Sequence, residues 1–281
     1  FVSFPDPHHP FNPPGHYWDM YQPDQFDVPI RFSDHKHPVP PLQFQHEMKE
    51  RGERPAVKQA PFMDDEQAIR ETMALTAGMI TMVDDAIGGI VDTLKATGQF
   101  DNTVICFNSD HGDYLGDSNL LLKGAWQRDS ISRVPFIWSD PDDRRARESD
   151  ALSSTIDISS TVLDRCGIDP YFGMQGISLM PAIDGKPIDR ESLLIEFNDS
   201  GVRMGFEKSA RVRTIRTRNW RLTHYGDADW GELYDLREDP DELRNLWDAP
   251  ECADVRCDLT SRLLFRLIEI VDRSPMPLHQ S

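Results

Sequence analysis

The sequence predicts an α/β fold followed by a small antiparallel subdomain, and two changes of pattern carry this prediction. Helical periodicity alternates with short apolar runs as far as about residue 205, which favours a parallel sheet covered by helices on both faces. Beyond that point, short strands are separated by Arg-Asn and Gly-Asp turns, which favour hairpins. The 281 residues suffice for one large domain and a small one. We therefore divide the chain into residues 1–204 and 205–281.

The N-terminal third contains one long loop and one long helix. Residues 5–61 are rich in proline and histidine, so an ordered loop is predicted there, because proline interrupts helices and central strands. The residues before it, Phe1-Val2-Ser3-Phe4, are typical of the end of a core strand. A chain that begins without methionine inside a strand indicates a portion of a longer protein. From Asp64 to Gly98, apolar residues recur at steps of three and four, which predicts an amphipathic helix kinked near Gly88-Gly89.

The remaining elements follow from shorter patterns. Three apolar runs predict buried parallel strands, at residues 103–107, 134–138 and 193–197, with a helix at 155–166 that ends before Gly167. The C-terminal part predicts three antiparallel strands and a closing amphipathic helix, at residues 211–217, 220–225, 232–236 and 259–271.

Composition limits the classes of partner. The formal net charge of −18 repels nucleic acid and anionic membrane surfaces, so neither is an expected partner. A small anionic substrate remains compatible, since a bound metal ion and a few lysines reverse the potential locally. We expect no membrane span, because no apolar run approaches the roughly 18 to 20 residues that crossing requires. The four cysteines form no disulfide framework or metal-binding pattern.

The strongest local motif is Asn108-Ser109-Asp110-His111-Gly112-Asp113, directly after a predicted strand. Ligands bind beyond the carboxyl ends of strands in open sheets. A carboxylate and an imidazole, Asp110 and His111, can ligate Mn, Zn, Mg or Ca, and the imidazole is less typical of pure Ca sites. Taken alone, the motif is weak evidence for a metal site, because a surface turn capped by an aspartate explains it. Two ligands are also fewer than the four to six that a site needs.

Three further motifs carry charge near predicted strand ends. Lys123-Gly124 could hold an anionic oxygen, and Arg133-Val134-Pro135 places a basic residue before a strand. His8, between prolines in Pro7-His8-His9-Pro10, could protonate a leaving oxygen. Each also has a plain structural interpretation, as a solvated loop lysine, a salt-bridge partner and a loop histidine. His35-Lys36-His37 is more typical of a surface segment than of a zinc pair.

Together and in this order, the motifs resemble those of the sulfatase family, within the alkaline-phosphatase-like superfamily, over nearly the whole chain. The matching stretches are Phe4 to Phe11, Val83 to Gly88, Ser109 to Gly116, Leu122 to Gly124, Arg133 to Phe136, Glu232 to Leu236, Asp239-Pro240 and Asn245-Leu246. The resemblance implies an alkaline-phosphatase-like parallel or mixed sheet flanked by helices, with the small C-terminal subdomain described above.

The resemblance also implies roles for four residues. Asp110 and His111 are similar to two of the family's metal ligands, although relatives often have Asn where this chain has His111. That departure leaves the metal open: Ca is expected for most sulfatases, and Mn or Mg for relatives that hydrolyse phosphonate or phosphate esters. Lys123 is similar to the lysine that contacts the sulfate oxygens. His8 fits the H-x-P position of the substrate histidine, a candidate for assisting the leaving group, and His9 is the less favoured of the pair.

The family's nucleophile comes from a C/S-x-P-x-R motif whose Cys or Ser becomes formylglycine, and this motif is absent here. The nearest stretch, Ser3-Phe4-Pro5-Asp6-Pro7, has proline in place of the arginine. The chain is therefore expected to lack the N-terminal part of the enzyme, with the remaining metal ligands, and to be inactive alone. The parent enzyme is expected to be a sulfuric ester hydrolase that acts on a small anionic sulfate ester. The alternatives are a phosphonate monoester or phosphodiester hydrolase of the same superfamily, or a non-catalytic fragment.

Overall fold

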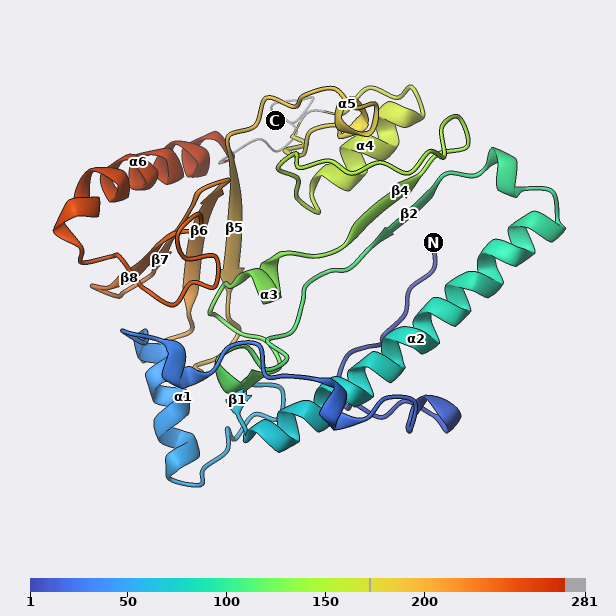
Figure 1. Ribbon diagram of the computed structural model, residues 1–281. Helices are drawn as coiled ribbons and strands as arrows, with labels where there is room; N and C mark the ends of the chain where they lie inside the picture. Colours follow the sequence, from blue (N-terminus) through green and yellow to red (C-terminus); the bar gives the residue numbers. More distant parts are fainter. Residues whose placement is uncertain (172, 271–281) are drawn as a thin grey trace, which may run out of the picture. The chain divides into compact units, whose positions relative to one another are not determined.

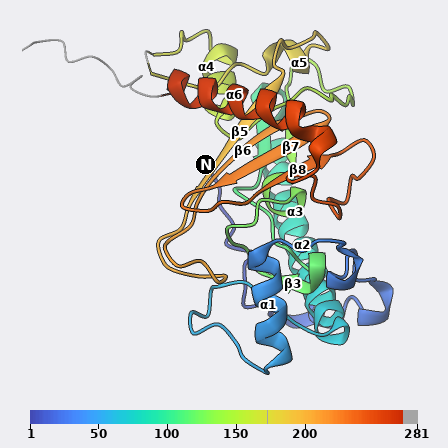
Figure 2. The same ribbon diagram turned by 90° about the vertical axis from the view of Figure 1, so that its left-hand side faces the viewer.

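A computed structural model describes residues 1–171 and 173–270, and these form two compact units. Unit 1 comprises Phe1–Arg144 and Asp199–Ala210, and unit 2 comprises the rest of the described chain. Figures 1 and 2 show the elements of both units along the chain. The α/β class is confirmed, since helices and sheets both contribute to the structure.

Unit 1 is built on the long helix α2 (Glu66–Ala96), in which Gly88 and Gly89 cause no interruption. Asp65 caps its N-terminus by accepting from the Ala68 amide at 2.9 Å. Past the other end, Gly98 adopts a left-handed φ of +67° and the Gln99 amide bonds to the Leu94 carbonyl, as at many helix C-termini. The predicted helix is confirmed, and the kink is wrong.

The N-terminal loop lies along α2 through two short 3-10 helices, η1 (Gly15–Tyr17) and η2 (Pro23–Gln25). The Tyr17 hydroxyl donates to Asp85 at 2.7 Å, and the hydroxyls of Tyr21 and Thr81 are hydrogen-bonded at 2.9 Å. Gly78 permits this approach, since a Cβ at that position would lie 2.3 Å from the Tyr17 carbonyl oxygen.

The same loop contains a helix that the sequence prediction missed, α1 (Pro40–Glu50). Its two prolines stand at the first helical positions, where a backbone N–H has no intrahelical partner, so Pro-Pro begins this helix rather than preventing it. The other short elements of unit 1 are η3 (Phe32–Asp34), η4 (Phe100–Asn102), η5 (Asp117–Asn119) and α3 (Asp129–Ser132).

Unit 1 also contains two small antiparallel sheets. One pairs β1 (Phe62–Met63) with β3 (Leu120–Leu121), and the other pairs β2 (Ile105–Asn108) with β4 (Phe136–Ser139). The predicted parallel arrangement of these strands is therefore wrong. Parallel pairing needs a covering crossover, and the chain between β2 and β4 holds only short elements. No strand forms at Phe1–Phe4.

Unit 2 contains one four-stranded antiparallel sheet in the order β5-β6-β7-β8, formed by β5 (Ser192–Asn198), β6 (Arg211–Thr217), β7 (Trp220–Tyr225) and β8 (Gly231–Asp235). Its C-terminal hairpins are confirmed, whereas the third predicted parallel strand proves to be β5 of this sheet. The compact units meet along the chain after Arg144, Asn198 and Ala210, and the domain division at 204 and 205 stays a prediction. The apolar run of β5 specified a strand but carried no information about which strand it pairs with.

One face of this sheet packs against α6 (Ala253–Ile270), which η6 (Pro250–Cys252) precedes (Figures 1 and 2). The helix predicted at 259–271 is confirmed over its described residues, and residue 271 lies outside them. Burying a leucine side chain contributes about 1.5–3 kcal/mol, so this shared core anchors the helix. Its buried members are Ile215, Leu222, Leu233, Leu259 and Leu263.

The alternate residues of the same strands form a buried ionic network around Arg221. This side chain has no exposed surface, and it donates to Glu242 at 2.5 Å and to Glu232 at 3.0 Å. Burial alone would lower the pKa of Arg221, but the two carboxylates outweigh burial and hold it well above its ordinary value. The Tyr225 hydroxyl donates to Glu232. Because one face is apolar and the other ionic, the strand register is strongly specified.

The remaining helices of unit 2 are α4 (Asp157–Arg165) and α5 (Met180–Ile183). Asp157 is fully buried and accepts two hydrogen bonds from Arg190, at 2.5 and 2.8 Å, and one from the Ile177 amide. A buried carboxylate needs such partners, because an isolated buried charge is costly.

Within the described residues, α2 is the one helix long and apolar enough to cross a bilayer by length and composition, and 22% of its most apolar window is buried. Core helices of soluble proteins meet the same two criteria, so this finding by itself assigns no membrane span.

Candidate functional site

The predicted metal pair lies in the turn that follows β2. The Asp110 carboxylate accepts from the His111 amide at 2.8 Å, and its other oxygen lies 3.6 Å from His111 Nε2. His111 Nδ1 lies 2.8 Å from the Gly112 carbonyl oxygen. A carbonyl can only accept, so Nδ1 carries the proton, and Nε2 donates toward Asp110 in the charged ring and offers a lone pair in the neutral ring. Both side chains are exposed, Asp110 to 85%. The pair therefore presents one oxygen and one nitrogen donor to the same side.

The turn is held in place by its glycine. A Cβ on Gly112 would lie 1.8 Å from the Ser130 carbonyl oxygen, and the Gly112 amide donates to Ile131 at 2.9 Å. No other residue type tolerates that approach. The segment at the start of α3 thus fixes where the metal pair sits.

Lys123 reaches this region from the end of a compact loop, residues 113–122. The Tyr114 amide donates to the Leu122 carbonyl, and the Gly116 amide to the Leu120 carbonyl, each at 2.8 Å. Gly124 continues the chain beneath Met204, whose sulfur would lie 2.7 Å from a Cβ at that position. Lys123 itself is half-buried.

Asp113 joins the two ends of this loop. Its Oδ1 accepts from the amides of Leu115 and Leu122, both at 2.9 Å. Burial raises the pKa of Asp113, and the two amide donors, Lys123 and His111 counteract part of that rise. This carboxylate stands in the motif that the sequence singled out, but no role was predicted for it. Its position one residue past Gly112 was the only signal available.

Electrostatic interactions show which predicted residues the structure brings together. Burial lowers the pKa of Lys123, and the negative charges of Asp113 and Asp110 oppose that shift. For Asp110, burial raises the pKa, but hydrogen bonds and the charge of His111 outweigh it and leave the pKa lowered. Lys123 and the metal pair therefore lie in one cluster, not on opposite faces of unit 1.

The two histidines of the Pro-rich loop differ in how they relate to Lys123. Their rings stack with centroids 4.1 Å apart, and His8 Nδ1 lies 2.6 Å from the His9 carbonyl oxygen. His8 is exposed, whereas the Nδ1 of His9 is buried without a hydrogen-bond partner. Burial lowers the pKa of His9, and the nearby His8 and Lys123 lower it further. The structure thus brings His9 within electrostatic reach of Lys123, and His8 lies beside it.

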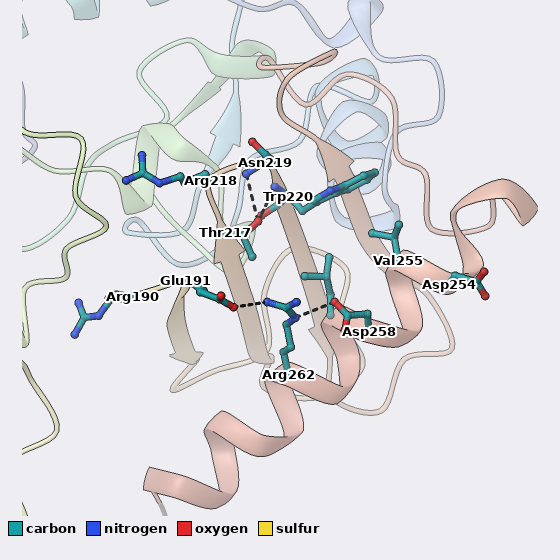
Figure 3. A pocket seen from close by; sticks show the side chains of 11 residues that line it. Arg190, Glu191, Thr217, Arg218, Asn219, Trp220, Asp254, Val255, Asp258 and Arg262 are labelled. Carbon is teal, nitrogen blue, oxygen red and sulfur yellow. Dashed lines mark hydrogen bonds and ion pairs between the residues drawn. The ribbon is translucent and has the colours of Figure 1, made fainter. Parts of the chain in front are cut away.

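A groove of about 640 Å³ lies elsewhere, in unit 2, between α6 and the start of β7 (Figure 3). Its charged side chains neutralise one another: Arg262 donates to Glu191 at 3.0 Å and to Asp258 at 2.8 Å. Arg218 pairs with Asp150 at 2.6 Å. The groove contains none of the predicted site residues, and its internal pairing leaves no concentrated charge for an anion.

A carboxylate–imidazole pair beside a half-buried lysine is a donor set suited to a metal-assisted site for an anionic ester. Comparison with known proteins agrees with this class. The sulfatase family model matches residues 1–168, and the model for the C-terminal part of N-sulphoglucosamine sulphohydrolase matches residues 123–268. The chain belongs to the sulfatase family.

Individual relatives extend the comparison. A multifunctional alkaline phosphatase superfamily protein, PehA, from Trinickia caryophylli is 29% identical over 95% of this chain and 55% of its own length. The choline-sulfatase of Rhizobium meliloti is 30% identical over 89% of this chain and 46% of its own. Among solved structures, a phosphonate monoester hydrolase from Silicibacter pomeroyi is 26% identical, with a TM-score of 0.80 over 95% of this chain and 55% of that one. The chain thus spans about half the length of the curated relatives it matches.

Membership of this family implies, in general, a divalent metal ion and a formylglycine nucleophile. The exposed Asp110 oxygen and, in the neutral ring, Nε2 of His111 fit a metal as part of its coordination shell. Among residues 1–171 and 173–270, no group of three or more His, Cys, Asp or Glu side chains is arranged to hold a metal ion. The described residues therefore fit part of a metal site and do not complete one.

Proposed function

We propose that the full-length enzyme hydrolyses a sulfate ester and that Asp110, His111, Lys123 and His8 belong to its active site. The observation that supports this most directly is the electrostatic coupling of Lys123 to Asp110 in the turn after β2. A cation beside a carboxylate that would ligate a metal can bind the non-bridging oxygens of a sulfate group.

Each residue would act through a stated atom. The Lys123 ammonium would donate to the non-bridging sulfate oxygens, in the bound ester as in the transition state. An imidazolium at His8 would donate its proton to the departing alcohol oxygen. Asp110 and His111 would hold a divalent metal, which we propose is Ca, with Mn or Mg as the alternatives that His111 favours. When present, the metal supplies Lewis acidity and formylglycine supplies the nucleophile.

A second candidate is hydrolysis of a phosphonate monoester or phosphodiester at the same site. It is supported by the similarity to the Silicibacter phosphonate monoester hydrolase and to the Trinickia superfamily protein. Both ester types present an anionic tetrahedral centre, so Lys123 and the metal pair would serve either.

We also propose that an N-terminal part of the same enzyme packs on α2 and on the β2–β4 sheet and completes the site. Two observations support this. The relatives are about twice as long as the matched region, and apolar side chains on these elements are exposed, with Ile80 at 53% and Ile137 at 59%. Large apolar side chains exposed on a helix and a sheet are typical of a surface that another segment covers.

The test is a kinetic comparison on the purified full-length protein. We expect turnover of an aryl sulfate to exceed that of a phenylphosphonate monoester, and EDTA to abolish it. Lys123→Ala should lower kcat/KM for the preferred ester by about 10²-fold or more, the scale for removing one charge-stabilising donor. Lys58→Ala, at an exposed lysine of the same unit, serves as the control. A folded K123A enzyme with unchanged kcat/KM would exclude the assigned site, and a preference for the phosphonate would select the second candidate.

A further inference from the structure

We propose that Asp113 is a positioning residue: its carboxylate clamps the loop 114–122 and so fixes where Lys123 enters the active site. The inference rests on the proposed function of Lys123, and it assigns a role to a residue outside the predicted set.

The geometry of the clamp is specific. One oxygen of Asp113 accepts from the amide of Leu115, next to the start of the loop, and from the amide of Leu122, at its end. Leu122 immediately precedes Lys123, so the second hydrogen bond holds the residue to which the lysine is joined. A single side-chain atom thereby joins the turn that contains Asp110 and His111 to the residue before Lys123, the lysine proposed to hold the anion.

The loop requires such a clamp because its backbone is unfavourable. Four of its non-glycine residues adopt positive φ: Leu115 at 41°, Ser118 at 57°, Asn119 at 61° and Leu122 at 68°. Leucine rarely adopts this region, because its Cβ crowds the backbone there. The two leucines held in it are the two whose amides Asp113 binds. Strained conformations persist only where surrounding contacts over-determine them.

The burial of the clamp strengthens it. Tyr114, the residue after Asp113, is 1% exposed, and its hydroxyl donates to the Trp126 carbonyl at 2.8 Å. This hydrogen bond attaches the loop to the chain at residue 126. Leu121 and Leu122 belong to a buried cluster with Val28 and Ile69. Hydrogen bonds shielded from water are stronger and more costly to lose than exposed ones.

Two substitutions separate the hydrogen bonds that Asp113 accepts from its negative charge. Asp113→Asn keeps an acceptor oxygen at the Oδ1 position and removes the negative charge, whereas Asp113→Ala removes both. Asp101→Ala, at an exposed aspartate of the same unit, is the matched control. Each variant is made in the full-length enzyme, alone and together with Lys123→Ala. The readouts are KM and kcat for an aryl sulfate and hydrogen exchange at the amides of Leu115 and Leu122.

The clamp predicts a distinct pattern. D113A should raise KM about tenfold or more, with a smaller change in kcat, since a misplaced Lys123 loses binding that ground and transition states share. It should also accelerate exchange at both leucine amides about tenfold. D113N should keep KM within about threefold of wild type and preserve the slow exchange. In the K123A background, D113A should raise KM by less than about twofold, because Asp113 acts through Lys123 and the effects of coupled residues are not additive.

Other outcomes would overturn the proposal. An unchanged KM in folded D113A contradicts it. The proposal also fails if the increases in KM caused by D113A and by K123A multiply in the double variant, because independent effects indicate that Asp113 has a merely structural role. If D113A fails to fold, D113N decides: wild-type KM supports the clamp, and a tenfold rise shows that the charge matters instead. If the wild-type enzyme hydrolyses no ester, the proposed function fails while hydrogen exchange still tests the clamp.

Discussion

At the scale of single residues, the two histidines of the Pro-rich loop differ in exposure and in electrostatic surroundings. His8 is exposed and keeps Nε2 available, while His9 is half-buried beside His8 and within reach of the Lys123 charge. An imidazole that must deliver a proton to a leaving group needs access to the substrate. One that lies beside a lysine and has a lowered pKa is suited to remain neutral. The resemblance favoured His8 for catalysis, and this assignment stays a prediction.

The assignment can be tested through the leaving group. His8→Ala in the full-length enzyme should lower kcat by about 10²-fold or more for an alkyl sulfate, the scale of general acid catalysis. The loss should shrink for 4-nitrophenyl sulfate, whose leaving oxygen needs little protonation. His9→Ala is the matched comparison and should change KM more than kcat. Equal losses of kcat with both leaving groups would show that His8 is not the acid.

How far the sequence predicted the site is also decided at single residues. Asp110, His111 and Lys123 were predicted because their residue types and order carry chemistry. The structure places Lys123 within electrostatic range of Asp110, and the roles of the three residues stay predictions. Asp113 was missed because its function depends on which amides it reaches. The positive φ angles of Leu115 and Leu122 leave no signal in the sequence, since leucine is not a turn residue.

At the scale of secondary-structure elements, the contact between α6 and β7 makes stability depend on pH. His224 lies in β7, with Nε2 3.1 Å from the Thr260 hydroxyl of α6 and its ring edge-on to Trp247. Burial lowers the pKa of His224, and the charge of Arg256 lowers it further. The unfolded chain, with an ordinary His pKa near 6.5, therefore binds a proton at a higher pH than the folded one.

The sign follows from that difference. Because the unfolded state binds more protons between the two pKa values, the contribution of His224 to stability is complete above about pH 7 and is lost as pH falls below 6.5. We expect His224→Asn to flatten the dependence of the midpoint of urea unfolding on pH between 7.5 and 5.5. Unfolding is monitored by the fluorescence of the tryptophans in unit 2. His16→Asn, at an exposed histidine, should keep the wild-type slope. An identical slope in H224N would contradict this account.

Elements were predicted well where local patterns decide them. The periodicity of α2 and the hairpins β6 to β8 follow from neighbours in sequence. The pairing of β2 with β4 and of β5 with β6 joins distant residues, and an apolar run of four or five residues fits parallel and antiparallel neighbours alike. Pro40-Pro41 shows the converse case. The rule that proline interrupts a helix does not apply at the first helical positions, so a helix begins where the sequence predicted a loop.

At the scale of the whole molecule, the chain as given is expected to lack both turnover and a tight metal site. Calorimetry of this chain with Ca and Mn should give no stoichiometric tight site, because Asp110 and His111 complete only part of a shell and affinity depends on the rest. An aryl sulfate assay should stay at the buffer rate. Tight binding that Asp110→Ala removes would show that further ligands lie within this chain.

The connection between β5 and β6 has a consequence for dissecting the protein. The strands belong to unit 2, and their ends Asn198 and Arg211 are paired, yet Asp199–Ala210 belongs to unit 1. Met204, within that connection, lies against Gly124, next to Lys123. Three positions along the gene therefore separate the units, and no single stop codon isolates either one. A truncation after Arg144 would retain every predicted catalytic residue and still lose the cover over Gly124, so it would not reproduce the site of the intact unit.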